Sequence, residues 1–511
     1  MSPMASETTA SGDKPPPSTS VLEAAQDSTP QNSPEVESYS TFSDFTRTYL
    51  TYLLGVVIVL STLTATIYFP LIPLLSSDFS VSVQAINLTV TVYAILQGVS
   101  PPIIASFSDA YGRRPVLLGL IVIYSAACLG LSLGHRSYTV LLALRALQSI
   151  GGSATPALAY GIVADVAVVS ERGKMLGPML STCNAISALG PIIGGAVAQT
   201  TGAYKWVFFA LLILSLACFM LVGLTMPETA RSVVGNGSMP APTLFRPWCC
   251  CATRLTSDSA SGKRQDFNTP RPQWGLMMAF HSLRIILYPD TAAVLWMVAT
   301  SYSVYYTFQV AIPIIFADIY HYHYFTVGLT FLPGLAGMTI GGIVAGKLVD
   351  RNFAAVARKQ NIAMDREKFE DLGDFPIESA RYRHIFIPVI MEVALVVAYG
   401  WVILNKVHPA LPLVMQFFIC ASSTLLSHTA SALLVDIFVK NSSASYAAGQ
   451  LMRCGLAAAS AAVLDPLVRA VGQGWYFTIF GCFVGSSALV SVTLSRNVGA
   501  KWRERRRTTA K

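Results

Sequence analysis

Long apolar stretches recur along this chain and constrain its fold more than any other feature of the sequence. A helix rises 1.5 Å per residue, so roughly 20 apolar residues cross a hydrocarbon core about 30 Å thick. Only 12% of the residues are charged, against about 25% in a soluble domain, so lipid must surround most of the chain. The sequence therefore predicts an all-α membrane protein with twelve transmembrane helices, at about residues 48–75, 84–107, 115–134, 138–163, 176–199, 204–226, 291–316, 326–349, 385–405, 410–436, 445–468 and 474–495.

Lysines and arginines are shared unequally between the two faces of the predicted membrane. When both termini are placed on one side, the outer loops hold only Arg136, Lys205, Lys406 and Arg469, and two further arginines lie inside spans. The rest of the 35 lysines and arginines then lie on the side of the termini. Because an excess of Lys and Arg marks the cytoplasmic face, we expect both termini in the cytoplasm. The plasma membrane is the location that we expect.

The order of spans and loops divides the chain into five parts. A Ser-, Thr- and Pro-rich start predicts a disordered cytoplasmic tail, and the last residues form a basic cytoplasmic tail. Between them lie two six-helix bundles joined by a cytoplasmic loop. The predicted parts are the first tail at 1–47, the first bundle at 48–226, the central loop at 227–290, the second bundle at 291–495 and the basic tail at 496–511.

The two predicted bundles share traces of sequence. Asp109 closes span 2 and Asp350 closes span 8, 241 residues later. Pro70 ends span 1 and Pro313 ends span 7, 243 residues later. The matching offsets predict a duplicated six-helix unit with pseudo-symmetric halves. Many secondary transporters are built from such repeats, with the substrate site between the halves near the middle of the membrane.

Residues outside the spans suggest contacts with lipid. The basic stretch at 501–507 could bind nucleic acid, but beside a membrane we expect it to touch anionic lipid. Cys249, Cys250 and Cys251 stand together in the central loop. They could be palmitoylated or adjacent by chance, and the sequence leaves both readings open. No cysteine falls in an outer loop, so we expect no disulfide.

A compact group of charges follows span 2. Asp109, Gly112, Arg113 and Arg114 place an acid, a turn residue and two bases at the predicted cytoplasmic surface. Charge–dipole contacts there contribute about 0.3–1 kcal/mol each, enough to bias two conformations without fixing one. Ordinary membrane topology explains the arginines but not the Asp and Gly. We therefore expect a conformational gate here, with a second copy at the end of span 8 in Asp350 and Arg351.

An arginine lies inside span 4, about 10 Å from the outer surface by the helical rise. Burying Arg145 costs about 2.5–3.5 kcal/mol on insertion scales, so it should face a wet cavity or a partner. Gln148, Ser149 and Gly152 follow at i+3, i+4 and i+7 and share one polar face of the helix. A structural arginine is the alternative. We expect Arg145 and Gln148 to take part in proton coupling.

Glycines and a proline interrupt span 5. Pro191 removes a backbone hydrogen bond and kinks the helix, while Gly190, Gly194 and Gly195 let another helix approach closely. Span 8 has a similar small face, formed by Gly334, Gly337, Gly341 and Gly342. Such helices can rock or seal a cavity, and simple packing is the alternative.

Aromatic and amide side chains at helical spacing are candidates for a substrate cavity. They suit an amphipathic organic solute, and two intramembrane arginines could attract an anion. Some of the tyrosines could instead belong to the interfacial belt. The candidates are Tyr93, Gln97, Asn184, Tyr302, Tyr305, Tyr306, Gln309, Gln450 and Arg453.

Chemistry other than transport finds little support in the sequence. The run at 341–348 resembles a phosphate-binding loop, but Leu348 replaces the Ser or Thr that would hold Mg²⁺. A membrane enzyme would need a nucleophile or a metal set, and no His, Cys and Asp group has ligand spacing. A sensor would need a large signalling domain. We therefore expect no enzyme, no cofactor and no metal.

These motifs together resemble the major facilitator superfamily and, within it, the twelve-span drug:proton antiporters of fungi. The loop after span 2 is similar to the family pattern G-x-L-a-D-r-x-G-r-k, with Ala105 for the first Gly, and Phe353 replaces the later Gly of the second copy. Span 4 resembles R-x-x-q-G, with Ser149 for Gly. Span 5 matches the core of the antiporter signature, although Ile186 stands where its leading Gly belongs. The run P-E-T-A-R at 227–231 is also similar to a family motif.

This resemblance, over 48–495, implies alternating access between two bundles in the major facilitator fold. It implies the export of a small organic compound, namely a drug-like molecule, a secondary metabolite or an organic acid, in exchange for protons. A uniporter or a proton-coupled importer is the alternative. Relatives often place a carboxylate in span 1, but residues 48–77 contain none; Glu392 and Asp465 are the remaining intramembrane acids. The partners that we expect are the substrate, protons and lipid, and we expect a monomer that binds no nucleic acid.

Overall fold

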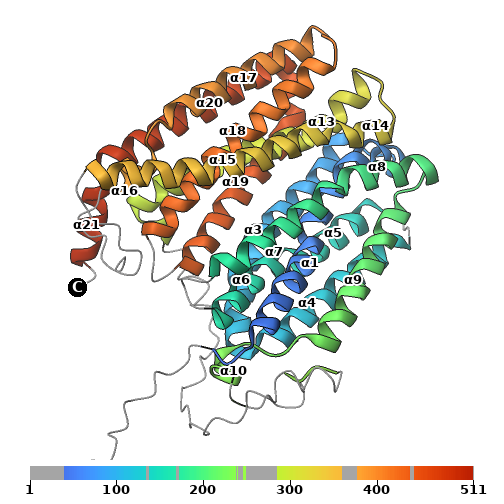
Figure 1. Ribbon diagram of the computed structural model, residues 1–511. Coiled ribbons are helices and arrows are strands. Elements are labelled where there is room, and N and C mark those ends of the chain that lie inside the picture. Colours follow the sequence, from blue (N-terminus) through green and yellow to red (C-terminus); the bar gives the residue numbers. More distant parts are fainter. Residues whose placement is uncertain are drawn as a thin grey trace, which may run out of the picture. The chain divides into compact units, whose positions relative to one another are not determined.

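The computed structural model describes residues 40–133, 137–167, 172–237, 239, 245–248, 285–359, 377–437 and 442–509. In these residues the regular secondary structure is helical, without strands (Figure 1). We call the side at which the first helix begins the inner side, which is the predicted cytoplasmic side, and the opposite side the outer side. Cys249, Cys250 and Cys251 lie outside the described residues.

The N-terminal half contains ten α-helices and one short 3₁₀ helix in the described residues. Ser43 and Ser82 cap the first and third α-helices by accepting backbone N–H groups. The elements are α1 (Asp44–Tyr68), η1 (Phe69–Leu71), α2 (Ile72–Phe79), α3 (Val83–Tyr111), α4 (Arg113–Ser132), α5 (Tyr138–Ser153), α6 (Thr155–Val166), α7 (Arg172–Ala188), α8 (Gly190–Thr201), α9 (Lys205–Thr225) and α10 (Arg231–Val234).

The C-terminal half repeats the pattern of long helices and adds a helix in the basic tail. Gly472, with a φ of 83°, makes the sharp turn between its last two long helices. The elements are α13 (Pro289–Asp318), α14 (Tyr324–Leu329), α15 (Phe331–Lys359), α16 (Ile377–Arg381), α17 (Phe386–Leu404), α18 (Ala410–Ile437), α19 (Ser442–Val471), α20 (Gln473–Asn497) and α21 (Gly499–Thr509).

Nine helical segments of the described chain are long and apolar enough to cross a membrane. This confirms the prediction of a helical membrane protein, and each segment coincides with a predicted span. They are Asp44–Phe79, Val83–Tyr111, Arg113–Ser132, Lys205–Thr225, Tyr324–Val349, Phe386–Leu404, Ala410–Leu434, Ala447–Val471 and Gln473–Asn497.

The other three predicted spans differ from these nine in a physical way. The span at 138–163 is broken into α5 and α6, and the span at 176–199 into α7 and α8, because each second helix starts with a proline at its first turn. The third, α13, is one helix of 30 residues, but its Tyr, Ser, Thr and Gln residues lower its mean hydropathy. The total of twelve spans stays a prediction.

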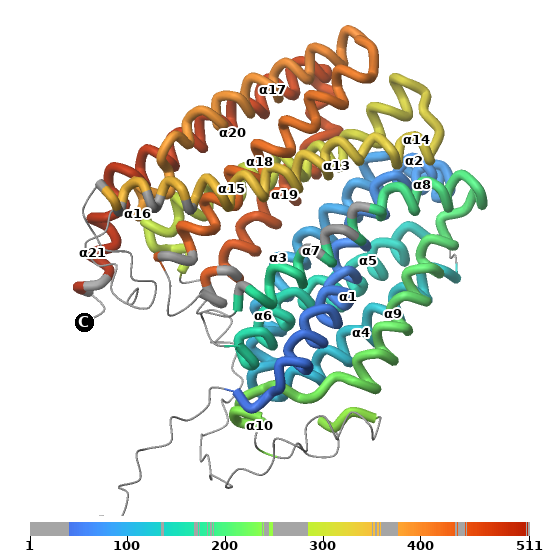
Figure 2. Tube along the Cα trace, in the orientation of Figure 1, coloured from blue at the N-terminus to red at the C-terminus, as the bar shows by residue number. Residues whose placement is uncertain are grey.

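Helices from the two halves pack directly against one another. α3 packs against α19, and α8 packs against α14 (Figures 1 and 2). Toward the outer side, the Gln84 side chain donates to the Ala462 carbonyl at 3.0 Å, and the Phe325 N–H donates to Gln199 at 3.0 Å. The Phe69 ring lies 5.9 Å from that of Tyr306. These contacts join the halves near the outer ends of their helices.

The basic tail folds as α21 and docks on its own half of the protein. Arg503 pairs with Glu378 of α16 at 3.4 Å, and both side chains are buried. Arg506 pairs with the buried Asp290 at the start of α13 at 3.2 Å. Lys501, by contrast, is exposed. Part of the charge that we expected to face lipid therefore turns toward protein carboxylates.

Candidate functional site

Arg145 lies in an aromatic cage at the centre of the N-terminal half. Its guanidinium carbon lies 4.0 Å from the ring centre of Tyr68 and 4.4 Å from that of Tyr93. One guanidinium nitrogen donates to the Gln148 side-chain oxygen at 2.7 Å. The Gln148 amide in turn donates to the Cys128 sulfur at 3.1 Å. Arg145 is only 1% exposed, so these groups stand where water would otherwise solvate the cation.

The cage offsets part of the cost of burying Arg145 without an acid. In the part of the chain that the structure describes, no carboxylate lies within ion-pair distance of this guanidinium. A cation–π contact contributes about 0.5–1 kcal/mol at an exposed site and about 2 kcal/mol when desolvated, and a hydrogen bond to a charged group contributes about 1.5–3 kcal/mol. The positive charge is therefore held in place but not neutralised.

The predicted cavity residues of the C-terminal half lie together on α13 and α19. The ring of Tyr302 lies 5.8 Å from that of Tyr305 and 6.1 Å from that of Tyr306. The Arg453 guanidinium carbon lies 5.0 Å from the ring centre of Tyr302. The Tyr306 ring lies 5.9 Å from that of Phe69 in the N-terminal half. These tyrosines thus extend from Arg453 to the contact between the halves.

The remaining cavity candidates have different surroundings. Gln309 is fully buried, and neither atom of its amide has a hydrogen-bond partner in the described structure. Gln450 donates to the Cys454 sulfur at 3.5 Å. Gln97 is half-buried on α3. The side chain of Asn184 lies outside the described residues, so its role stays a prediction.

The charges after span 2 form a network on the inner side. Arg113 forms an ion pair with Asp109 and donates from Nε to Asp165 at 2.9 Å. Glu228 accepts the backbone N–H groups of Arg113 at 2.9 Å and Arg114 at 3.2 Å, which are the first two of α4. A carboxylate at a helix N-terminus interacts favourably with its dipole. The network joins the inner ends of α3, α4 and α6 to the segment after α9.

Gly112 is required at the centre of this network. Its φ of 100° lies in the region that favours glycine, and a Cβ there would stand 2.8 Å from Glu228 Oε2. The Arg114 side chain donates to the Gly223 carbonyl at 2.7 Å. Each predicted residue of this motif therefore has a defined contact.

The second copy of the motif has a different arrangement. The side chain of Asp350 lies outside the described residues, and Arg351 is exposed. On the inner side of this half, ion pairs come instead from α21, through Arg503 and Arg506. Burial and the neighbouring Glu378 raise the pKa of Tyr382, so this hydroxyl stays neutral beside the cluster.

The glycines of the antiporter motif lie at two close helix contacts. A Cβ on Gly194 would stand 2.5 Å from the Ile67 carbonyl oxygen of α1. A Cβ on Gly195 would stand 2.4 Å from the Tyr324 carbonyl oxygen of the other half. Gly190 meets α1 in the same way, and Pro191 approaches Gly328 of α14. The motif thus brings α8 into backbone contact with both halves on the outer side.

The glycines of span 8 make a different contact. A Cβ on Gly337 would stand 2.1 Å from the Phe417 carbonyl oxygen, and one on Gly341 would stand 2.3 Å from that of Ala421. Both partners belong to α18 of the same half. These glycines therefore serve packing inside the C-terminal half.

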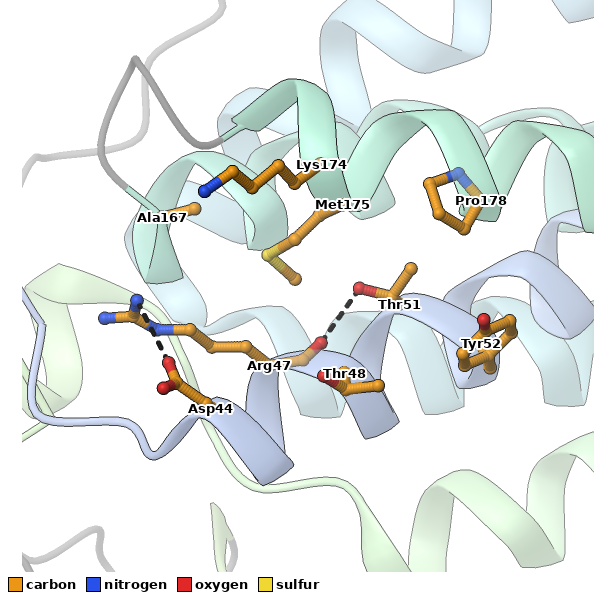
Figure 3. A pocket seen from close by; sticks show the side chains of 9 residues that line it. All are labelled: Asp44, Arg47, Thr48, Thr51, Tyr52, Ala167, Lys174, Met175 and Pro178. Carbon is orange, nitrogen blue, oxygen red and sulfur yellow. Dashed lines mark hydrogen bonds and ion pairs between the residues drawn. The ribbon is translucent and has the colours of Figure 1, made fainter.

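A cavity of about 340 Å³ opens between the inner ends of α1 and α7, apart from the predicted cavity residues (Figure 3). Arg47 lies on one wall with Asp44 at 3.8 Å, and Lys174 lies on the other. The Thr51 hydroxyl donates to the Arg47 carbonyl at 2.9 Å. This cavity has charged side chains at its inner end, and its lining also includes Thr48, Tyr52, Ala167, Met175 and Pro178.

Sequence reasoning missed two residues of these clusters. Tyr68 is the second ring of the arginine cage, and it comes from α1 rather than from the helix of Arg145. Asp165 holds Arg113, and its signal is a single acid directly after an apolar run. Tyr68 carries no comparable local signal.

Comparison with known proteins identifies the family. The sequence profile of the Major Facilitator Superfamily matches residues 54–459. The chain is 33% identical to the MFS-type transporter tstD of Talaromyces stipitatus, over 98% of this chain and 90% of the relative. It is 30% identical to Citrate exporter 1 of Aspergillus niger, over 82% and 80%. It is 27% identical to the MFS antiporter QDR2 of Candida albicans, over 93% and 94%.

A solved structure agrees with this assignment. The human organic anion transporter MFSD10 matches with a TM-score of 0.51 and 17% identity, over 88% of this chain and 99% of that one. At this identity the likeness concerns the fold. The chain belongs to the major facilitator superfamily. It is a multi-pass membrane protein and a secondary transporter of small molecules, not an enzyme.

Proposed function

We propose that this transporter exports a small organic compound in exchange for protons, from a plasma membrane with both termini in the cytoplasm. The observation that carries the proposal is the buried Arg145, held by two tyrosine rings and Gln148, with no carboxylate at ion-pair distance among the described residues. An uncompensated cation inside a membrane marks a functional site by default. It attracts an anionic group and disfavours a proton nearby, so it can couple substrate occupancy to protonation.

Alternating access supplies the movement. The outer contacts of Gly195 with α14 close the route to the outside in this conformation. In the opposite conformation the inner ends of the halves would meet instead, and the network of Asp109, Arg113 and Asp165 would act as the gate there. We expect the chain to complete this cycle as a monomer in contact with membrane lipid.

The relatives support the direction of transport and the exchange. One is named an exporter of citrate and another an antiporter. The cavity side chains suit a compound with an aromatic or apolar body and an anionic group, because tyrosines lie beside Arg453 and Arg145. An organic acid, a drug-like molecule or a secondary metabolite fits this description.

Reconstituted vesicles test this proposal. The purified transporter is inserted in lipid vesicles, a pH gradient is imposed, and a panel including citrate, aromatic acids and neutral drugs is screened. We expect uptake of at least one anionic compound against its own gradient when the compartment that it enters is acidic. Flux that ignores the pH gradient would identify a uniporter, and flux in the direction of the protons would identify an importer.

A further inference from the structure

Glu392 is a buried acid that has no role in the transport cycle proposed above. It lies on α17, six residues beyond Phe386, which places it about 9 Å from the inner end of that helix by the helical rise. Its side chain is 2% exposed. The Ser423 hydroxyl of α18 donates a hydrogen bond to its carboxyl group. The acid is thus fixed between two helices of the C-terminal half.

The other buried carboxylates of the described chain all have charged or multiple donors. Asp290 pairs with Arg506, and Glu378 pairs with Arg503. Glu228 accepts four backbone N–H groups. Glu392 has one hydroxyl donor, and no cation lies within ion-pair distance among the residues that the structure describes.

The helices packed against Glu392 offer it no counter-charge. On α18 the buried Cys420 thiol lies three residues before Ser423. At this level α20 presents Gly485, whose Cβ would meet the Val393 side chain. The cation of α20, Arg496, stacks on Phe386 at 5.4 Å, at the inner end of α17. The other titratable groups that the structure describes on these helices are the exposed His428 of α18, whose ring faces Gly342 of α15, and Tyr476 and the exposed Cys482 of α20. On α17 itself the buried Tyr399 is the remaining one.

An acid in these surroundings is neutral. Removing an ionised carboxylate from water costs several kcal/mol, and one hydroxyl donor does not offset this cost. We propose that Glu392 is a proton-binding site of the transport cycle, loaded in this conformation and emptied when α17 and α18 separate enough to admit water. The proton binds to a carboxylate oxygen and leaves to water, with no other bond made or broken. This inference rests on the proposed proton exchange and assigns its proton site.

A short chain of contacts connects this acid to the substrate candidates. Ser423, the donor to Glu392, belongs to α18, and α18 packs against α13, which carries Tyr302 and Tyr305. The Tyr305 ring contacts that of Tyr302, which lies under Arg453. A change of charge at Glu392 therefore acts on α18, which packs directly on α13.

The first test measures protonation without any substrate. The infrared absorption of protonated carboxylic acids is followed from acid to alkaline pH for the wild type and Glu392→Gln in lipid vesicles. We expect a band that the wild type loses reversibly at alkaline pH and that the variant lacks throughout. A Glu392 band that persists at every pH would show a permanently neutral structural acid and overturn the proposal.

The second test measures flux with the panel compound that the wild type transports. Exchange without a pH gradient reports transport itself, and the gain from an imposed gradient reports coupling. Gln keeps the shape of the side chain but cannot release a proton. We therefore expect Glu392→Gln to keep the flux measured without a pH gradient and to lose the increase in flux that the gradient causes. A gain equal to that of the wild type would refute the assignment. A wild type with exchange but no gain would refute the proton exchange and the role of Glu392 with it.

If Glu392→Gln does not fold, a pair of serine variants tests whether Glu392 binds the proton. Ser423→Ala removes the donor that stabilises the ionised form, so the pH of half-maximal coupled flux should rise. Ser422→Ala is the matched control, because this neighbour donates to carbonyls of its own helix at 2.9 and 3.0 Å. Identical pH profiles for the two variants would contradict the proposal.

Discussion

Among the residues that the structure describes, the N-terminal half of this transporter buries a base, Arg145, that pairs with no acid, and the C-terminal half buries an acid, Glu392, that pairs with no base. Arg145 lies between two tyrosine rings with one amide partner. Glu392 lies between two helices with one hydroxyl partner. Both side chains are almost completely buried, at 1% and 2% exposure.

The difference lies in what each group can do with its charge. A guanidinium stays protonated in proteins, so Arg145 is a permanent charge that requires a permanent cage. A buried carboxyl can become neutral by taking up a proton, so Glu392 needs almost no partner. The N-terminal half therefore carries a fixed charge, Arg145, and the C-terminal half carries a charge that protonation can switch off, Glu392. Variants of each half distinguish these two roles.

Removing the fixed charge should have the largest effect. We expect Arg145→Ala to insert normally but to lose gradient-driven flux, by about tenfold or more, since 1.4 kcal/mol already corresponds to a factor of 10. Arg145→Lys keeps the charge without the planar group that stacks on both rings and should retain part of the flux. Flux in vesicles and elution on gel filtration measure both. Coupling equal to that of the wild type in Arg145→Ala would remove this residue from the mechanism.

Preventing close contact between the halves should have the next largest effect. Gly195→Ala would place a Cβ 2.4 Å from the Tyr324 carbonyl oxygen, so the outer side should open and exchange should slow severalfold. Gly119→Ala is the matched control, because nothing lies within 4 Å of its Cβ position. Spin labels at the exposed Ser77 and His408 report the outer distance. An unchanged distance in Gly195→Ala would contradict a closed outer side.

The aromatic cage itself should have a smaller, graded effect. Tyr93→Leu removes one face from Arg145, and the loss of about 0.5–2 kcal/mol predicts a fall in coupled flux of roughly 2- to 30-fold. Tyr93→Phe keeps the ring and loses only a hydrogen bond to the Ser61 carbonyl at 3.3 Å. The ratio of flux with a pH gradient to flux without it is measured for both variants. Equal losses would mean that the hydroxyl, not the ring, holds the arginine.

The sequence predicts the fixed charge better than its surroundings. Arg145 and Gln148 lie three residues apart on one helix, so their contact follows from helical spacing. Tyr68 comes from another helix, and no local pattern specifies which helices become neighbours. The same holds for α21, where counting charges suggests contact with lipid. The acids that pair with its arginines lie far away in sequence, Asp290 in α13 and Glu378 in α16. Pro156 shows a third limit, because hydropathy alone does not reveal the break between α5 and α6. The break in span 5, by contrast, follows from Pro191.

The inner network of the N-terminal half should give the smallest effect. Asp109 is about half exposed, and an exposed ion pair contributes only about 0–1 kcal/mol. Arg113 also keeps its contact with the less exposed Asp165, at 2.9 Å. We therefore expect Asp109→Asn to shift the balance between inward and outward conformations by less than about fivefold, and Asp165→Asn to shift it further. Alkylation rates of cysteines placed on the inner side measure this balance. A larger effect of Asp109→Asn would mean that the gate depends on contacts formed only in the opposite conformation, where Asp109 would have a new partner from the C-terminal half.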